Sequence, residues 1–182
     1  MRNPVAILLS VLFAASLCVT GALGDAKGDL LAAAKNFGAL KSVHATITSR
    51  DGTTFSLDMV EPGKVRGISP QGFEFVRIGS TSWVKMGGTW HSYSLGSNGA
   101  TQMAMARGSK LQKNILTQCT VADGGMSAVN GVSAHKYHLV CNSGGGATDV
   151  WVANGLPIKM VDGDTTLIWS NYNNVADIKA PI

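Results

Sequence analysis

The segment Ala39–Ile68 constrains the fold more than any other part of the chain, because its apolar residues recur at every second position. Two such runs flank Arg50–Thr53, and the Asp-Gly pair within that segment is a strong hairpin signal. Because alternate side chains of a strand point to opposite faces, the segment predicts an antiparallel sheet with one apolar face. The apolar positions are Val43, Ala45, Ile47, Phe55, Leu57 and Met59.

The rest of the chain continues this pattern after an initial helical segment. Gly28–Leu40 places apolar residues three or four positions apart, which predicts a short amphipathic helix. Residues 95–113 lack a clear period, and we expect a loop with one or two short helices over the sheet. Further strands are expected at 65–68, 73–78, 81–86, 90–93, 116–121, 134–141, 149–152, 158–161 and 165–170. The predicted fold is α+β, with an antiparallel sheet of about ten strands, an N-terminal helix and short middle helices.

The N-terminus is typical of a secretory signal peptide. Arg2 precedes an uncharged apolar run at Val5–Val19, and small residues occupy two positions of Ala22–Gly24. The run is shorter than the roughly 20 residues of a membrane span. Lipidation at Cys18 and an uncleaved anchor remain alternatives. We expect a signal peptide at 1–24 and a single domain at 25–182.

Charge and cysteine content narrow the function classes. Loss of Arg2 with the signal peptide lowers the formal charge from +4 to +3, and no run of basic residues indicates nucleic-acid binding. Cys119 and Cys141 remain after cleavage, and in an exported chain they predict one disulfide. The alternative is a pair of buried free thiols. Their spacing is unlike that of a redox motif or a zinc site.

No pattern in the chain is typical of catalysis. His135 and His138 are three positions apart, so on a strand they point to opposite faces and do not form a metal site. The sequence contains no nucleophile elbow and no phosphate-binding loop. We therefore expect no cofactor, no metal and no catalytic residue. An enzymatic alternative would need His44, His91 or His138 to meet an acid.

The apolar face is the strongest functional candidate. Large side chains are numerous on the predicted strands, whereas the predicted helices are short, so we expect part of the face to stay open to a lipophilic ligand. Methionines suit an adaptable wall because their side chains are flexible. The predicted lining consists of Phe55, Leu57, Met59, Phe73, Phe75 and Trp83, with Met103 and Met105 in a lid. Taken singly, each of these residues also fits an ordinary core.

Several segments resemble the LolA-like superfamily of periplasmic lipoprotein carriers, which includes LppX/LprG-type lipid-binding lipoproteins. The resemblance covers nearly all of the chain after residue 24 and is weakest at Gly96–Lys110. The segments that carry it are Ala39–Thr46, Val60–Arg66, Ile78–Trp90, Val129–Val132, Val150–Pro157 and Asn171–Pro181.

This resemblance implies a curved, incomplete antiparallel barrel, a half-barrel whose concave face holds acyl chains, without catalysis. One position departs from the family pattern. The carriers have an arginine directly before the proline that follows the second strand, where this chain has Glu61 before Pro62. That difference puts lipoprotein shuttling in doubt and leaves the lipid-binding fold unaffected.

The sequence thus predicts an exported, non-enzymatic monomer of the periplasm or cell envelope. Its expected ligand is a lipid or the acyl chains of a lipoprotein, with transient membrane contact, a possible envelope protein partner and no nucleic acid. The alternative is a structural or interaction module of the cell envelope with a filled core and no lipid ligand.

Overall fold

The computed structural model describes residues 25–93, 118–142 and 146–182. These described residues form one helix, α1 (Ala26–Gly38), and an eleven-stranded antiparallel sheet that is open between β6 and β7. The strands are β1 (Ser42–Thr48), β2 (Thr54–Val60), β3 (Lys64–Ile68), β4 (Glu74–Ile78), β5 (Thr81–Met86), β6 (Thr89–Tyr93), β7 (Cys119–Val129), β8 (Val132–Cys141), β9 (Ala147–Ala153), β10 (Leu156–Asp162) and β11 (Thr165–Ser170). The prediction of an N-terminal helix with a curved, incomplete antiparallel barrel is confirmed, and the predicted middle helices fall outside the described residues.

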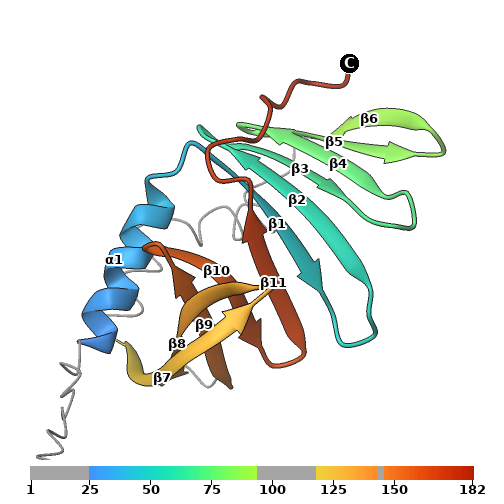
Figure 1. The fold of residues 1–182 in the computed structure, drawn as a ribbon. Helices are drawn as coiled ribbons and strands as arrows, with labels where there is room; N and C mark the ends of the chain where they lie inside the picture. The colour runs from blue at the N-terminus through green and yellow to red at the C-terminus, as the bar shows by residue number, and fades with distance from the viewer. Residues whose placement is uncertain (1–24, 94–117, 143–145) are drawn as a thin grey trace, which may run out of the picture.

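Strand order shows that the sheet consists of two meanders. The order is β6-β5-β4-β3-β2-β1-β11-β10-β9-β8-β7, so β1 to β6 form one meander and β7 to β11 the other. They join where β1 pairs with β11, for example at Ala45 and Trp169. The sheet curls so that α1 lies on its inner side, along the second meander (Figure 1). We call this inner side the concave face and the opposite side the convex face.

Tight turns connect most neighbouring strands. Asn130-Gly131 and Asn154-Gly155 each have both residues at positive φ, the conformation of two-residue turns that match the twist of a hairpin. Strand β7 is longer than the predicted 116–121 and continues to Val129. Its register shifts between Asp123 and Met126, where a bulge absorbs the Gly-Gly pair that interrupts the sequence pattern.

The helix is held to the sheet at both of its ends. Leu30 and Ala34, about one helical turn apart, pack with Tyr137, Leu139 and Val150 of β8 and β9. At its C-terminal end, Phe37 is 4% exposed and meets the indole of Trp169 edge-on, with ring centroids 5.4 Å apart. Within the described ranges, no helix is long and apolar enough to span a membrane.

The predicted disulfide between Cys119 and Cys141 is confirmed. These residues face each other across β7 and β8 at the open edge of the sheet. The Lys27 ammonium donates a hydrogen bond to the Cys119 carbonyl at 3.2 Å, which links α1 to the same edge.

Tyr172 gives the fold a pH dependence that can be measured. Its hydroxyl donates to the carbonyls of Pro157, at 2.7 Å, and Trp169, at 3.1 Å. Burial raises the pKa of Tyr172 to about 12, whereas an unfolded tyrosine has a pKa of about 10. The unfolded chain therefore loses this proton first as pH rises, and the stability that the neutral hydroxyl contributes is lost between pH 10 and about 12.

We expect Tyr172→Phe to be less stable at pH 7 by about 1 kcal/mol, the usual net contribution of a hydrogen bond. Above pH 10 the variant should lose stability less steeply than the wild-type protein, because it lacks the ionising group. Urea unfolding at pH 7, 9, 10 and 11 measures both effects. Tyr93→Phe is the control, since Tyr93 is 40% exposed. Equal alkaline slopes for the wild-type protein and Tyr172→Phe would contradict the prediction.

Candidate lipid-binding wall

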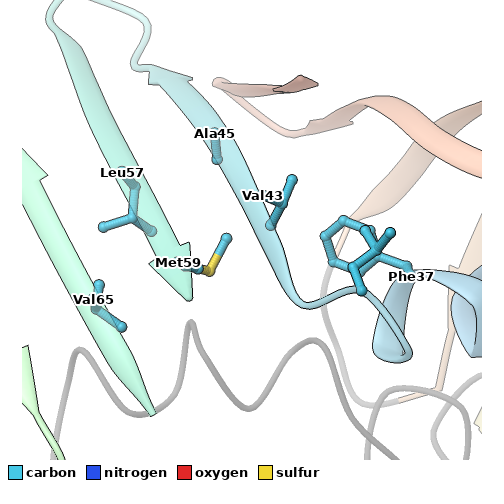
Figure 2. Close-up of a cluster of buried hydrophobic side chains, with 7 residues drawn as sticks. Phe37, Val43, Ala45, Leu57, Met59 and Val65 are labelled. Carbon is cyan, nitrogen blue, oxygen red and sulfur yellow. The ribbon is translucent and has the colours of Figure 1, made fainter. Parts of the chain in front are cut away.

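The register of the first meander places a continuous set of apolar side chains on the concave face. Val43 pairs with Met59, Ala45 with Leu57 and Ile47 with Phe55, so these residues of β1 and β2 share a face. Strand β3 continues the surface, because Val65 pairs with Met59. The side chains of this cluster that are labelled in Figure 2 come from α1, β1, β2 and β3.

Gly67 lets two aromatic rings cross the middle of this surface. The rings of Phe55 and Phe75 come from the strands on either side of β3 and stack with centroids 5.9 Å apart. A Cβ atom on Gly67 would lie 2.1 Å from the Phe75 ring and 2.6 Å from the Phe55 ring. The absence of a side chain at Gly67 therefore allows both rings to lie over β3.

The exposure of the apolar side chains increases from β2 toward the turn between β3 and β4. Leu57 and Met59 are buried, Phe55 and Phe75 are partly buried, and Phe73 is 47% exposed. Phe73 and Phe75 are in ring contact, with centroids 6.2 Å apart. The apolar surface thus runs without a break from the interior to the turn that connects β3 and β4. We call Phe55, Leu57, Met59, Val65, Gly67, Phe73 and Phe75 the concave wall.

The structure brings together five of the predicted lining residues and separates a sixth. Phe55, Leu57, Met59, Phe73 and Phe75 all belong to the concave wall. The prediction that Trp83 lines the same surface is wrong, because Trp83 pairs with Val76 and lies on the convex face. Met103 and Met105 fall outside the described residues.

Two members of the wall were not predicted from the sequence. Val65 lies between Lys64 and Arg66, so the alternation of polar and apolar residues at the start of its strand could have assigned it to the apolar face. The signal at Gly67 is its position inside a strand, where glycine often marks close approach of another group. The face on which Trp83 lies is determined by the two-residue turn Gly79-Ser80. This turn pairs Ile78 with Thr81 and therefore Val76 with Trp83.

Three histidines form cross-strand pairs with aspartates. Nδ1 of His44 lies 2.7 Å from Asp58 Oδ1, and Nδ1 of His138 lies 2.7 Å from Asp149 Oδ1. A third pair joins His135 to Asp123. The sequence did not indicate these partners, because each aspartate lies on a neighbouring strand.

The environment of Asp149 shows what these pairs do. Hydrogen bonds from Lys136 and His138 lower the pKa of Asp149, so it stays ionised and links β8 to β9. Among residues 25–93, 118–142 and 146–182, no three acidic, histidine or cysteine side chains group as metal ligands. We interpret the histidine–aspartate pairs as links between strands.

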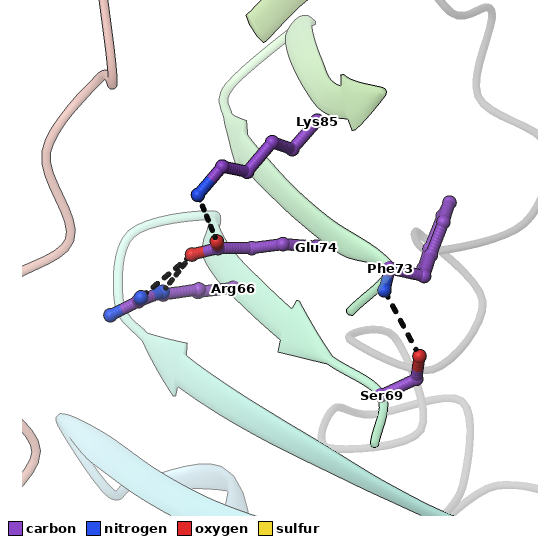
Figure 3. A network of polar contacts seen from close by, with 5 residues as sticks. All are labelled: Arg66, Ser69, Phe73, Glu74 and Lys85. Atoms are coloured by element: carbon purple, nitrogen blue, oxygen red, sulfur yellow. Dashed lines mark hydrogen bonds and ion pairs between the residues drawn. The ribbon is translucent and has the colours of Figure 1, made fainter. Parts of the chain in front are cut away.

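A polar groove of about 550 Å³ lies on the convex face, beneath the C-terminal segment. Its floor carries an ion-pair network in which the Glu74 carboxylate lies 2.6 Å from Arg66 and 3.6 Å from Lys85 (Figure 3). The C-terminal segment is held by an ion pair between Lys64 and Asp177, and the ammonium lowers the pKa of Asp177. The groove is thus lined by charges of both signs, unlike the concave wall.

Comparisons with solved structures agree with this geometry. No family model matches the sequence, and no curated protein matches it. The chain is similar to the lipoprotein LppX of Mycobacterium tuberculosis, with 16% identity and a TM-score of 0.61 over 84% of this chain and 97% of that chain. It is also similar to LprF of Mycobacterium bovis, with 18% identity and a TM-score of 0.63 over 86% and 96%.

The chain has an LppX-like fold. The expectation raised by the sequence resemblance is therefore confirmed for the fold. MucB shares it more distantly, with 17% identity and a TM-score of 0.54 over 85% of this chain and 60% of the MucB chain. In the LppX-like half-barrel of this chain, the concave wall is the candidate functional site.

Proposed function

We propose that this chain is an exported, non-enzymatic protein that binds a lipid or acylated ligand along its concave wall. The observation that carries the proposal is the stacking of the Phe55 and Phe75 rings over Gly67. A side chain at that position would occupy the space that the rings of Phe55 and Phe75 use. Because Gly67 has none, the two rings form a continuous apolar surface across β3. Apolar surface of this kind is favourable for acyl chains, with about 25 cal/mol gained per Å² removed from water.

Other features support a binding role over catalysis. The described histidine–aspartate pairs link neighbouring strands, and none of their residues belongs to the concave wall. The similarity to LppX, which is described as a lipoprotein, is consistent with a protein of the cell envelope. We propose export through the signal peptide at 1–24, and the Cys119–Cys141 disulfide suits an oxidising compartment.

Uptake of a fluorescent fatty acid by the purified protein tests the proposal directly. We expect saturable binding of about one ligand per chain and competition by unlabelled fatty acids. Native mass spectrometry of protein from envelope fractions should show a bound lipid. Failure to take up the probe, together with no lipid bound after purification, would contradict the proposal and favour the alternative, an interaction module with a filled core.

Gly67→Val should weaken binding at the concave wall. The valine side chain would push the rings of Phe55 and Phe75 off β3, because even its Cβ would lie within 3 Å of both. We expect at least a tenfold loss of fatty-acid affinity and a decrease of about 1–3 kcal/mol in the free energy of unfolding. Probe titration and urea unfolding measure the two effects.

Gly146→Ala is the matched control, because a Cβ atom there would meet no atom within 4 Å. It should bind the probe as the wild-type protein does. If Gly67→Val folds and keeps full affinity for the probe, the rings of Phe55 and Phe75 do not form the binding surface.

A further inference from the structure

The polar groove on the convex face has the size of a site for a small organic molecule. Its volume of about 550 Å³ is within the range of such sites. One side is formed by a row of side chains that crosses five neighbouring strands, and the other by residues 175–179 and Pro181 of the C-terminal segment. The row consists of Asp58 of β2, Arg66 of β3, Glu74 and Val76 of β4, Lys85 of β5 and Trp90 of β6.

One buried carboxylate holds two of the cations in this row. The Glu74 side chain is only 14% exposed. Its Oε1 accepts hydrogen bonds from Nη2 of Arg66, at 2.6 Å, and from Nε, at 3.0 Å. The Lys85 ammonium lies 3.6 Å from Oε2, and Figure 3 shows both cations reaching the same carboxylate. Glu74 therefore fixes the position of both cations.

The two cations keep donors that are open to the groove. Their side chains are 44% exposed for Arg66 and 39% exposed for Lys85, much more than the carboxylate between them. A guanidinium has five N–H donors. In the part of the chain that the structure describes, Nη1 of Arg66 makes no hydrogen bond. The groove thus presents positioned cationic donors, with the matching carboxylate buried beneath them.

Positive charge is in excess around the groove. The carboxylates are Asp58, Glu74 and Asp177, and the cations are Arg66, Lys85, Lys179 and Lys64, which pairs with Asp177. With His44 neutral, four positive charges against three negative charges leave an excess of one. Lys179 is exposed and forms no ion pair with any described residue. This balance favours a ligand with a single negative charge.

Trp90 places an aromatic surface beside these cations. The Lys85 ammonium lies 5.7 Å from the centroid of the Trp90 ring, a distance at which a cation and a ring attract each other. The Trp90 side chain is partly buried, so part of its ring is accessible from the groove. An anionic group bound at Lys85 therefore has an apolar ring next to it. Aromatic rings pack favourably against one another.

We propose that this groove binds a small aromatic carboxylate. The ligand carboxylate accepts hydrogen bonds from Arg66 and Lys85, and charge-assisted bonds of this kind are the strong ones. The ligand ring contacts Trp90, and Lys179 contributes a further positive charge from the C-terminal segment. The groove and the concave wall lie on opposite faces of the sheet, so this inference does not depend on the proposed lipid-binding function.

The test compares probes that differ in their charge or in their ring. Purified protein is titrated calorimetrically at low salt with phenylacetate, 2-phenylethanol, 2-phenylethylamine and acetate. We expect phenylacetate to bind at least tenfold more tightly than each of the other three. The alcohol lacks the charge, the amine is repelled by the excess positive charge, and acetate lacks the ring. Added salt should weaken phenylacetate binding because it screens exposed charges.

Variants separate recognition from folding. Lys179→Gln removes an exposed, unpaired charge, so it should fold normally and lose threefold or more in affinity for phenylacetate. Arg66→Gln and Lys85→Gln should each lose at least tenfold, with urea unfolding to confirm that they are folded. Lys159→Gln is the matched control. Its ammonium also lies over an indole, 4.7 Å from the ring centroid of Trp151, but outside the groove, so its affinity should not change.

A spectroscopic readout locates the bound probe. In two-dimensional NMR spectra, the indole N–H signal of Trp90 should shift on addition of phenylacetate, and that of Trp151 should not. Binding that persists in both Lys85→Gln and Lys179→Gln would overturn the proposal. Loss of phenylacetate binding in Gly67→Val, with full binding in Lys85→Gln, would place the probe on the concave wall and also overturn it.

The ligand class has its own contrary result. Phenyl phosphate carries up to two negative charges, and tighter binding of phenyl phosphate than of phenylacetate would overturn the assignment to a carboxylate. Equal affinity for phenylacetate and 2-phenylethanol would show that the cations do not take part. A protein that binds phenylacetate in the groove but takes up no fatty acid would contradict the proposed function alone.

Discussion

Phe37→Ala should lower the free energy of unfolding by about 3–5 kcal/mol, the usual cost of deleting a buried phenyl ring. The ring is 4% exposed and belongs to the same buried cluster as Val43 and Met59 of the first meander. It also makes the edge-on contact with Trp169, which adds a favourable aromatic interaction. Because this residue ends the apolar stripe of α1, its loss should free the helix from the sheet and expose the inner part of the concave wall.

Urea unfolding measures the change in stability, and hydrogen exchange of the α1 amides reports whether the helix detaches. Phe73→Ala is the matched control. Its ring is 47% exposed, so we expect a change below about 1 kcal/mol. A decrease of less than 1 kcal/mol for Phe37→Ala would show that α1 is not held to the sheet by this ring.

Removal of the disulfide should have the second largest effect. The bond closes a loop between residues 22 positions apart, and chain-entropy estimates give about 3 kcal/mol for a loop of this size. We expect Cys119→Ala together with Cys141→Ala to lower the free energy of unfolding by about 2–4 kcal/mol. The open edge of the sheet should lose most order, because among the described strands β7 pairs only with β8.

Reductant provides the internal control for this variant. Dithiothreitol should lower the midpoint of thermal unfolding of the wild-type protein and leave that of the double variant unchanged. Hydrogen exchange should accelerate first along β7. A double variant as stable as the oxidised wild-type protein would show that hairpin pairing alone secures this edge.

Local patterns in the sequence were sufficient for most of the strands. Alternation located β1 and β2, and Asn130-Gly131 marked a turn that has the positive φ angles expected of such a pair. Strand β7 was predicted too short because Gly124-Gly125 reads as a break, whereas in the sheet a bulge accommodates the two glycines. A bulge depends on the partner strand, so alternation within one strand does not reveal it.

The candidate site was predictable to the extent that it depends on phase within one strand. Phe73 and Phe75 share a face because they are two positions apart, and the structure agrees. The placement of Trp83 depends on how β5 pairs with β4, and Gly67 matters only because two rings from different strands meet above it. Such properties arise from register and packing between strands, which a period of two does not encode.

The pairing of β1 with β11 has a consequence for how the chain folds. Within each meander every strand pairs with its neighbour in sequence, so both halves can form through local hairpins. Ala45 and Trp169, by contrast, come from nearly opposite ends of the described chain. Contacts between distant residues form slowly because a long loop must close first. We therefore expect two fast-forming halves whose joining along β1 and β11 sets the folding rate, with the core around Phe37 completed in that last step.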